Sequence, residues 1–167
     1  MNEIPHSARL FALVNRVRLT GRCALAKLAD VAEKKNRILV ASAHNAYKRL
    51  FAILPGYDLR FVETLAEAQS ALKANGFSLI MIGIYFEQSK MFELLRYVKS
   101  DRKYADRPVV CFRGIPLSGS FDVKPLELRC RALGASAFLD LTAFTDDGFG
   151  NAALRSRLIS LLYSNPS

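Results

Sequence analysis

The chain has 167 residues, of which 51% are hydrophobic and 23% charged, and its formal net charge is +9. This length suits one domain with an additional segment, and the composition excludes a chain that is disordered throughout. The three cysteines are widely spaced and there are only two histidines, so neither a disulfide framework nor a metal site is expected. The cysteine content fits a reducing compartment, taken here as the cytoplasm. The longest apolar run, Leu79–Phe86, has eight residues, whereas a membrane span needs roughly 18–20.

Residues 1–36 are predicted to form a basic, amphipathic helical segment ahead of the main domain. Residues 1–37 contain eight Lys/Arg and three Asp/Glu, so the basic excess is concentrated there. Small and apolar side chains recur at alternating steps of four and three residues, the spacing of a heptad seam: Leu10, Val14, Val17, Gly21, Ala24, Leu28 and Val31. The seam could pack on the chain's own domain, pair with the same helix of a second chain, or leave a basic face for nucleic acid or lipid.

From Arg37 to the end, short apolar strands alternate with helices, and residues 37–167 are predicted to form one domain. The predicted strands are 37–41, 58–62, 78–82, 108–112 and 137–141, and the predicted helices are 45–54, 64–75, 91–97, 125–132 and 152–163. Thr64 and Glu67 have the spacing of a capping box at the start of the second of these helices. Five such units predict an α/β fold, a doubly wound five-stranded parallel sheet in the flavodoxin-like order 2-1-3-4-5, with the N-terminal helix as an addition.

In folds of this kind, ligands bind at the carboxyl ends of the strands. The residues that follow the predicted strands there are Ser42, Ala43, His44, Gly83, Arg113 and Leu141. They offer one hydroxyl, one imidazole and one guanidinium, but no pair of carboxylates. No glycine-rich phosphate loop and no GxSxG motif occurs in the sequence, so an enzyme on this fold is not expected.

Four stretches, in order, carry a resemblance to a known family: RILVASAH, FSLIMIGIYF, PVVCFRG and LGASAFLDL. Together they resemble the response-regulator receiver domain of two-component signalling over about three quarters of the chain. The resemblance places Ser42 and Ala43 at the family's acidic pair, Gly83 at its phosphoacceptor aspartate, Arg113 at its Thr/Ser position, Leu141 at its lysine, Thr142 at its proline and Phe138 at its aromatic switch position.

Set against the family pattern, the residues needed for phosphorylation are replaced. Phosphoryl transfer to a carboxylate needs a nucleophile, a divalent cation to offset charge and fixed donors around the phosphoryl oxygens. A hard cation such as Mg²⁺ prefers carboxylate oxygens, which Ser42, Ala43 and Gly83 do not supply. The sequence therefore resembles a pseudo-receiver that keeps the fold without the chemistry, and neither a cofactor nor a metal is expected.

Three polar residues near this edge admit more than one interpretation. His44 is either a solvated loop histidine or a base or phosphate ligand, although no acidic partner is visible in the sequence. Arg113 either points to solvent or forms a permanent cationic latch with Glu87 or Asp140. An anion bound near Arg113 and His44 is a further possibility, because the guanidinium fork suits anions.

The function expected from these features is protein–protein interaction or dimerisation in a bacterial regulatory pathway of the two-component or phosphorelay type, with an unidentified protein partner. A nucleic-acid-associated regulator that uses the basic N-terminal helix is the alternative. It is less favoured because Phe11 is the only aromatic residue on that helix. The candidate interaction surface comprises Leu10, Val14, Val17, Leu28, Arg129, Arg131, Phe138, Asp140 and Arg155.

Overall fold

The computed structural model describes residues 37–74, 76–116 and 122–163. The predicted N-terminal helix, and with it Leu10, Val14, Val17 and Leu28, lies outside these residues. In chain order the described elements are β1 (Arg37–Ala41), the short 3-10 helix η1 (His44–Ala46), α2 (Tyr47–Ile53), β2 (Asp58–Val62), α3 (Leu65–Ala74), β3 (Leu79–Gly83), η2 (Phe86–Ser89), α4 (Met91–Ser100), β4 (Val109–Arg113), α5 (Lys124–Ala132), β5 (Ala137–Asp140), η3 (Leu141–Ala143) and α6 (Gly148–Tyr163).

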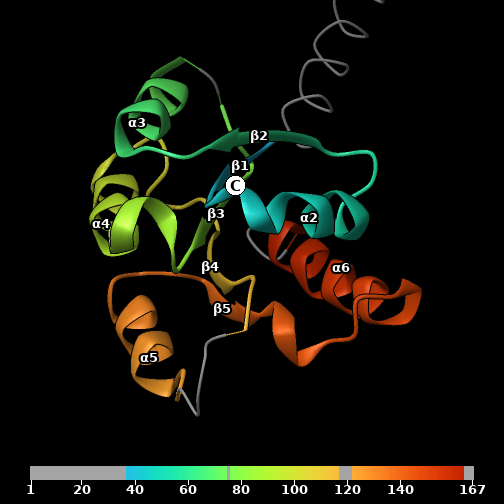
Figure 1. The fold of residues 1–167 in the computed structure, drawn as a ribbon. Coiled ribbons are helices and arrows are strands. Elements are labelled where there is room, and N and C mark those ends of the chain that lie inside the picture. The colour runs from blue at the N-terminus through green and yellow to red at the C-terminus, as the bar shows by residue number, and fades with distance from the viewer. Residues whose placement is uncertain (1–36, 75, 117–121, 164–167) are drawn as a thin grey trace, which may run out of the picture. The chain divides into compact units, whose positions relative to one another are not determined.

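The five strands form one parallel sheet in the order β2-β1-β3-β4-β5, which confirms the predicted topology (Figure 1). Helices α3, α4 and α5 cover one face of the sheet, and α2 and α6 cover the other. The two faces arise from the alternation of side chains along each strand. On β1, for example, Leu39 belongs to the core on the α3–α5 side, while Ile38 and Val40 belong to the core on the α2–α6 side.

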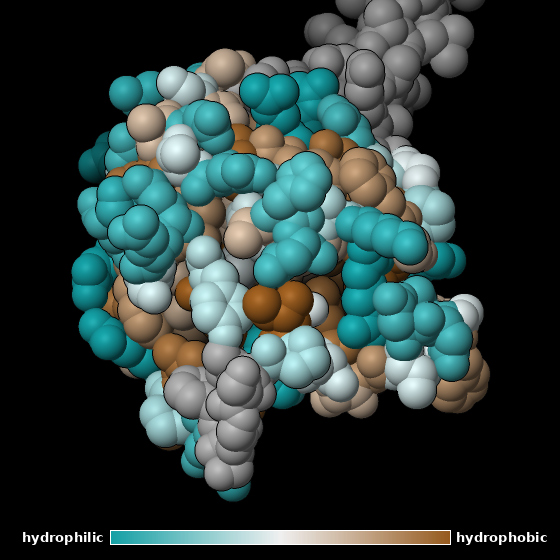
Figure 2. All heavy atoms as spheres, in the orientation of Figure 1, coloured by the Kyte–Doolittle hydropathy of each residue, from teal (hydrophilic) through white to brown (hydrophobic). Residues whose placement is uncertain are grey.

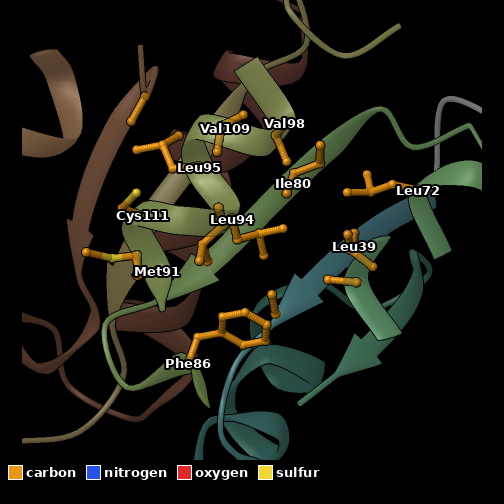
Figure 3. Close-up of a cluster of buried hydrophobic side chains, with 14 of the residues drawn as sticks. Leu39, Leu72, Ile80, Phe86, Met91, Leu94, Leu95, Val98, Val109 and Cys111 are labelled. Carbon is orange, nitrogen blue, oxygen red and sulfur yellow. The ribbon is translucent and has the colours of Figure 1, made fainter. Parts of the chain in front are cut away.

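The larger core lies between the sheet and helices α3 to α5 (Figure 3). Helix α4 supplies Met91, Leu94, Leu95 and Val98, all at helical spacing and all buried. Burial of a side chain of this size contributes roughly 1.5–3 kcal/mol, so the helix is held chiefly by this apolar stripe. Among the described helices, none is both long enough and apolar enough to cross a membrane.

Helix α6 begins at Gly148, one turn before the predicted start at residue 152. The difference arises from Asp147, whose carboxylate accepts a hydrogen bond from the Gly150 N–H at 2.8 Å, and whose carbonyl accepts one from the Asn151 N–H at 3.0 Å. Gly150 has no room for a side chain, because a Cβ there would lie 2.1 Å from the carbonyl oxygen of Thr145. Residues 148–151, which precede the predicted helix, therefore form the capped first turn of α6.

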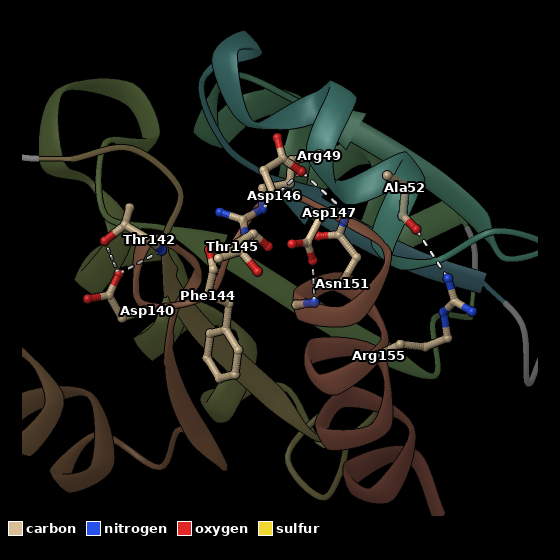
Figure 4. A network of polar contacts seen from close by, with 11 residues as sticks. Arg49, Ala52, Asp140, Thr142, Phe144, Thr145, Asp146, Asp147, Asn151 and Arg155 are labelled. Atoms are coloured by element: carbon tan, nitrogen blue, oxygen red, sulfur yellow. Dashed lines mark hydrogen bonds and ion pairs between the residues drawn. The ribbon is translucent and has the colours of Figure 1, made fainter.

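Two arginines join the α2 and α6 regions (Figure 4). The Arg49 side chain of α2 donates to the carbonyl oxygens of Phe144 and Thr145, at 2.7 and 3.1 Å. From α6, Arg155 donates to the carbonyl oxygens of Ile53 at 2.7 Å and Ala52 at 3.2 Å, near the end of α2. The last carbonyls of a helix lack partners within the helix, so Arg155 satisfies groups that would otherwise need water.

The capping box at the start of α3 is present as predicted from the sequence. The Glu67 carboxylate accepts from the N–H groups of Glu63 at 2.9 Å and Thr64 at 3.3 Å, and the Thr64 hydroxyl accepts from the Glu67 N–H at 3.2 Å.

We expect Thr64→Ala to lower the free energy of unfolding by about 1 kcal/mol, because the Glu67 N–H loses its acceptor. Urea unfolding checks this. Thr64→Ser keeps the hydroxyl and should retain most of the stability; equal losses for both variants would contradict the capping role.

Candidate functional site

The carboxyl ends of the central strands meet at one edge of the sheet, where the candidate residues were expected. β1 leads into Ser42, β3 ends at Gly83, and β4 ends at Arg113, which pairs with Asp140 of β5. Leu141 follows β5 directly and lies in η3 rather than in the strand, because the Asp140 carboxylate accepts a hydrogen bond from the Thr142 N–H at 3.0 Å and caps that turn. The candidates come from different strands, but they do not form one polar pocket.

Gly83 lies against two side chains that occupy the space in front of it. A Cβ at this position would lie 2.7 Å from Ser42 Oγ, 3.2 Å from Ser42 Cβ and 3.4 Å from Phe112 Cζ. Ser42 and Phe112 are both buried. Any side chain at position 83 therefore has to displace the serine hydroxyl before it can extend further.

Phe112 is the residue at this edge that sequence reasoning missed. It is fully buried, and it packs in the same apolar core as Leu141, Ala46 and Leu50. Its ring also lies close to Gly114, where a Cβ would be 3.4 Å from Phe112 Cε2. The sequence signal is an aromatic residue just before Arg113 at the end of β4. Leu141 is fully buried, so this part of the edge is hydrophobic core.

Arg113 forms the latch that was one of its two predicted roles, with Asp140 as the partner. Its Nε and Nη2 donate to the two carboxylate oxygens of Asp140 at 2.9 and 2.6 Å, and Nη2 also donates to Thr142 Oγ1 at 2.6 Å. The Thr142 hydroxyl in turn donates to Asp140 Oδ1 at 2.6 Å (Figure 4 shows the Asp140–Thr142 part). The Arg113 and Asp140 side chains are only 16% and 20% exposed. Such bidentate, partly buried pairs are the strong kind of ion pair.

The Asp140 carboxylate is held in its charged form. Burial acts to raise its pKa, but the hydrogen bonds from Thr142 and Arg113 outweigh burial and bring the pKa below its ordinary value. Both oxygens of this carboxylate are thus engaged with a cation of the chain itself.

Glu87 binds partners other than Arg113. Its carboxylate accepts from the Leu65 N–H at the start of α3 and from Lys90 Nζ at 2.8 Å, and the Lys90 hydrogen bond is the main reason why its pKa is lowered. Glu87, Gln88 and Ser89 all have positive φ angles, so the β3–α4 connection is a left-handed turn of three non-glycine residues. The carboxylate thus joins this turn to the start of α3.

His44 is an exposed loop residue, with 85% of its side chain accessible. Contrary to the expectation that it lacks an acidic partner, Nδ1 lies 3.4 Å from Glu63 Oε1, an oxygen that also accepts from the Tyr47 hydroxyl at 3.1 Å. Ala43 precedes it at the start of η1. His44 and Arg113 thus each bind a different carboxylate, so the arrangement does not favour a shared anion site.

A divalent cation does not fit this edge. Ser42 Oγ faces the space in front of Gly83, and both oxygens of Asp140 bind Arg113, whose positive charge repels a metal. Within the described ranges, no group of three or more His, Cys, Asp or Glu side chains could hold a metal ion. A groove of about 740 Å³ lies elsewhere, between β2 and α3, and is lined by Arg37, Asp58, Arg60, Ala66, Glu67, Ser70, Ala71, Ala74 and Phe77.

The candidate interaction residues of the described domain fall on separate surfaces. On α5, Arg129 lies over the Phe92 ring of α4 at 4.1 Å, and Arg131 pairs with Glu127 at 2.9 Å. Phe138 packs against the core on the α3–α5 side. Arg155 lies apart from these residues, at the junction of α6 with α2. The space-filling view in Figure 2 shows a mainly hydrophilic face with smaller apolar areas between the polar side chains.

The comparisons with known proteins identify the fold. No protein-family model and no curated protein matches the sequence. Solved structures of receiver domains match most of the described domain. They include the phosphorylated cyanobacterial phytochrome response regulator, at 17% identity and a TM-score of 0.60, with 78% of this chain and 96% of that chain covered. The receiver domain of a histidine kinase from Syntrophus aciditrophicus is 22% identical, with a TM-score of 0.57 and 79% and 96% covered.

A CheY-like receiver domain from Methanospirillum hungatei is 16% identical, with a TM-score of 0.59 and 77% and 94% covered. At these identities the likeness shows the fold alone. The chain therefore has the fold of a response-regulator receiver domain, as the resemblance of its strand segments implied.

The packing at Gly83 predicts that this position does not tolerate an acidic side chain. We expect Gly83→Asp to lower the free energy of unfolding by about 2–4 kcal/mol, because the carboxylate must enter a packed, largely apolar space against Ser42 and Phe112. Gly83→Ala should cost about 1 kcal/mol. Combining Gly83→Ala with Ser42→Gly removes the Oγ and Cβ atoms of Ser42 and should relieve the clash. A double-mutant cycle, with each stability measured by urea unfolding, tests this. Wild-type stability of Gly83→Asp would contradict this packing.

The latch predicts a pH-dependent contribution of Asp140 to stability. At pH 7, Asp140→Asn should lower the free energy of unfolding by about 2 kcal/mol, because Arg113 loses a charged acceptor. The folded-state pKa of Asp140 is lowered, so its contribution is present above its unfolded pKa of about 3.9 and is lost as pH falls through the folded pKa.

Urea unfolding between pH 2 and pH 7 tests this: the wild type should lose stability more steeply in acid than the variant. The exposed Arg37–Asp58 pair supplies the matched control, since Asp58→Asn should change stability by less than about 1 kcal/mol. Parallel pH profiles for wild type and Asp140→Asn would rule out the charged latch.

Proposed function

We propose that the protein is a signalling module with a receiver fold that works without phosphorylation, through contacts with other proteins. The observation that carries the proposal is the packing of Ser42 and Phe112 against Gly83, which fills the place where the resemblance puts a phosphoacceptor side chain. A phosphoryl group needs a nucleophile and a metal-bound cavity around its oxygens. This edge supplies packed side chains instead, so on this proposal the protein is not an enzyme and needs no metal.

The Arg113–Asp140–Thr142 cluster supports a domain whose β4–β5 edge keeps one conformation, without a switch driven by phosphorylation. It lies at the end of β4 and β5, where the resemblance places the Thr/Ser residue that would bind a phosphoryl group. In this chain the residue at that position is bound bidentately to a carboxylate of the neighbouring strand. An interaction of this kind does not depend on a ligand, and we infer that it holds the β4–β5 edge in one conformation.

We propose α5 and the adjoining β5 as the surface that contacts a protein partner. Leu128 is 68% exposed on α5, and Arg129 and Arg131 follow it on the same helix, with Arg131 paired to Glu127. An exposed apolar residue beside basic side chains suits an acidic protein surface with an apolar centre, because charge guides association while the apolar contact contributes affinity.

Homodimer formation through the N-terminal segment is the second part of the proposal. The heptad seam from Leu10 to Val31 requires an apolar partner surface, and a two-fold pair would bury two identical seams against each other. On this proposal, residues 1–36 are the assembly segment and residues 37–167 the signalling domain, acting in the cytoplasm.

Nucleic-acid binding by the basic N-terminal segment remains the alternative, favoured by the charge of that segment. Binding by phosphate contacts would weaken steeply as salt rises, because it releases counterions. Protein docking through Leu128 would depend less on salt.

One light-scattering experiment tests both parts of the proposal. The full chain should have the mass of a dimer, unchanged by Mg²⁺ and a small phosphodonor. Mass spectrometry of the peptides around Gly83 and the neighbouring strand ends should detect no phosphoryl group. A chain that begins at Lys35 should have the mass of a monomer. Gly83→Asp should also stay unphosphorylated, since Ser42, Ala43 and Leu141 support neither metal nor phosphoryl charge. A phosphoaspartate in the domain that changes the mass would disprove the constant state; a dimer that survives the truncation would place the interface on the domain.

A further inference from the structure

Strand β2 forms one edge of the sheet, and among the described strands it pairs only with β1 (Figure 1). The Ser42 N–H donates to the Val62 carbonyl oxygen at 3.1 Å, so the main-chain groups of Val62 face β1. Because these groups alternate in direction along a strand, those of Leu59 and Phe61 point outward, away from β1. The outer side of β2 thus offers the N–H and C=O groups with which a further strand would pair.

The side chains of residues 57–61 complement one another when the strand is reversed. Their sequence is Tyr-Asp-Leu-Arg-Phe, with Leu59 at the centre. If two copies of the strand pair antiparallel about Leu59, Asp58 of each copy lies opposite Arg60 of the other. Tyr57 then lies opposite Phe61. Opposite charges and aromatic rings that face each other across antiparallel strands are both stabilising, so all five positions meet a favourable neighbour.

The main chain fits this same register. The outward N–H and C=O groups of Leu59 in two copies would exchange a pair of hydrogen bonds. Asp58 and Arg60 would then lie opposite each other at a position without such bonds, where facing side chains are closest. A register centred on Asp58 or on Arg60 would place two like charges opposite each other, which is unfavourable. The charges therefore select the register centred on Leu59.

The α3 side of β2 has room for the charged side chains of a second copy. Asp58 and Arg60 line the groove of about 740 Å³ together with the small side chains of Ala66 and Ser70. Arg37 binds Asp58 at 2.8 Å, but the Asp58 side chain is still 56% exposed. Its carboxylate can therefore meet a second guanidinium at the groove, which would bridge the two copies.

The α2 side of β2 presents aromatic rings. The Phe61 ring lies 4.0 Å from the Tyr47 ring and 5.0 Å from the Phe51 ring, measured between centroids. Phe51 is 57% exposed, so this row of rings reaches the surface. A Tyr57 ring from a second copy would lie beside Phe61 and extend the row, and contacts between aromatic rings add to the burial of apolar area.

We propose that β2 pairs antiparallel with β2 of a second copy of this chain, centred on Leu59, and joins the two sheets into one. The contact is two-fold symmetric, as in most homodimers. Charges on an edge strand normally prevent pairing with other strands. Here an acid and a base, two positions apart, disfavour a foreign strand and fit an antiparallel copy. The contact uses only residues of the described domain and is additional to the proposed N-terminal seam, so either contact can hold without the other.

Amide hydrogen exchange of the folded, full-length chain, followed by NMR, tests this pairing. In the wild type the outward N–H groups of Leu59 and Phe61 should exchange slowly, because they are bonded to the second copy. Asp58→Arg and Arg60→Asp each place like charges opposite each other twice in the pair. Each variant should therefore raise the exchange rates of these two amides by at least about tenfold.

Mixing the two variants separates pairing between copies from an effect within one chain. Isotope-labelled Asp58→Arg, refolded with an excess of unlabelled Arg60→Asp, should regain slow exchange at Leu59 and Phe61, because two basic positions then face two acidic ones. An excess of unlabelled Asp58→Arg should give no recovery.

Glu93→Arg and Arg96→Asp are the matched controls. Both residues are exposed on α4, and the two variants change the net charge by the same amounts as the β2 variants, so they should leave the exchange rates unchanged. Fast exchange of the two β2 amides in the wild type, slow exchange in both β2 variants, or no recovery in the mixture would overturn the pairing.

Light scattering on the same samples keeps this proposal distinct from the N-terminal seam. A wild-type dimer whose Leu59 and Phe61 amides exchange fast would leave the seam standing and reject the pairing of β2. If Asp58→Arg does not fold, because it also loses its pair with Arg37, the wild type and Arg60→Asp still decide the result, since slow exchange in the first and fast exchange in the second are both required.

Discussion

The contact of Phe112 and Ser42 with Gly83 governs the carboxyl edge of the sheet, because it decides whether that edge is a cavity or part of the core. Parallel sheets of this order leave a crevice at the ends of their central strands, and ligands bind there. In this chain, Phe112 and Leu141 extend the apolar core between the sheet and the α2–α6 layer up to that edge. Close packing of this kind tolerates little change in volume, so the neighbours of Gly83 favour a residue without a side chain at this position.

The same edge is polar on its other face, and there the chain satisfies its own charges. Arg113 and Asp140 end adjacent strands, and the regular register of the parallel pair brings them opposite each other. Thr142 completes the cluster by accepting from the guanidinium and donating to the carboxylate. A buried charge without a partner costs free energy, so the mutual contacts of these three residues offset the cost of burying the charges of Arg113 and Asp140. At this edge, one face of β4 thus packs against apolar side chains, and the other carries the Arg113–Asp140 ion pair.

Helix α5 differs from the other described helices in how little of it is buried. Helix α4 presents a full apolar stripe to the sheet, whereas α5 presents Cys130 as its fully buried residue and leaves Leu128 exposed. Its fully buried residue, Cys130, belongs to the core between the sheet and helices α3 to α5.

The order of apolar strands and helices in the sequence determined the parallel sheet and its 2-1-3-4-5 topology, because alternating periodicities leave few ways to bury both faces. The capping box at Thr64 was also readable from the sequence, since it depends on local spacing and residue type. Only the tertiary structure decided which partner each polar residue has. Asp140 rather than Glu87 binds Arg113, and Glu63 approaches His44, because each contact joins segments whose approach depends on packing. The early start of α6 is instead a local effect, since Asp147 caps a residue only three positions further along the chain. Phe112 shows the same limit: in the sequence it is one more apolar strand residue, and only the register of β3 with β4 places its ring in front of Gly83.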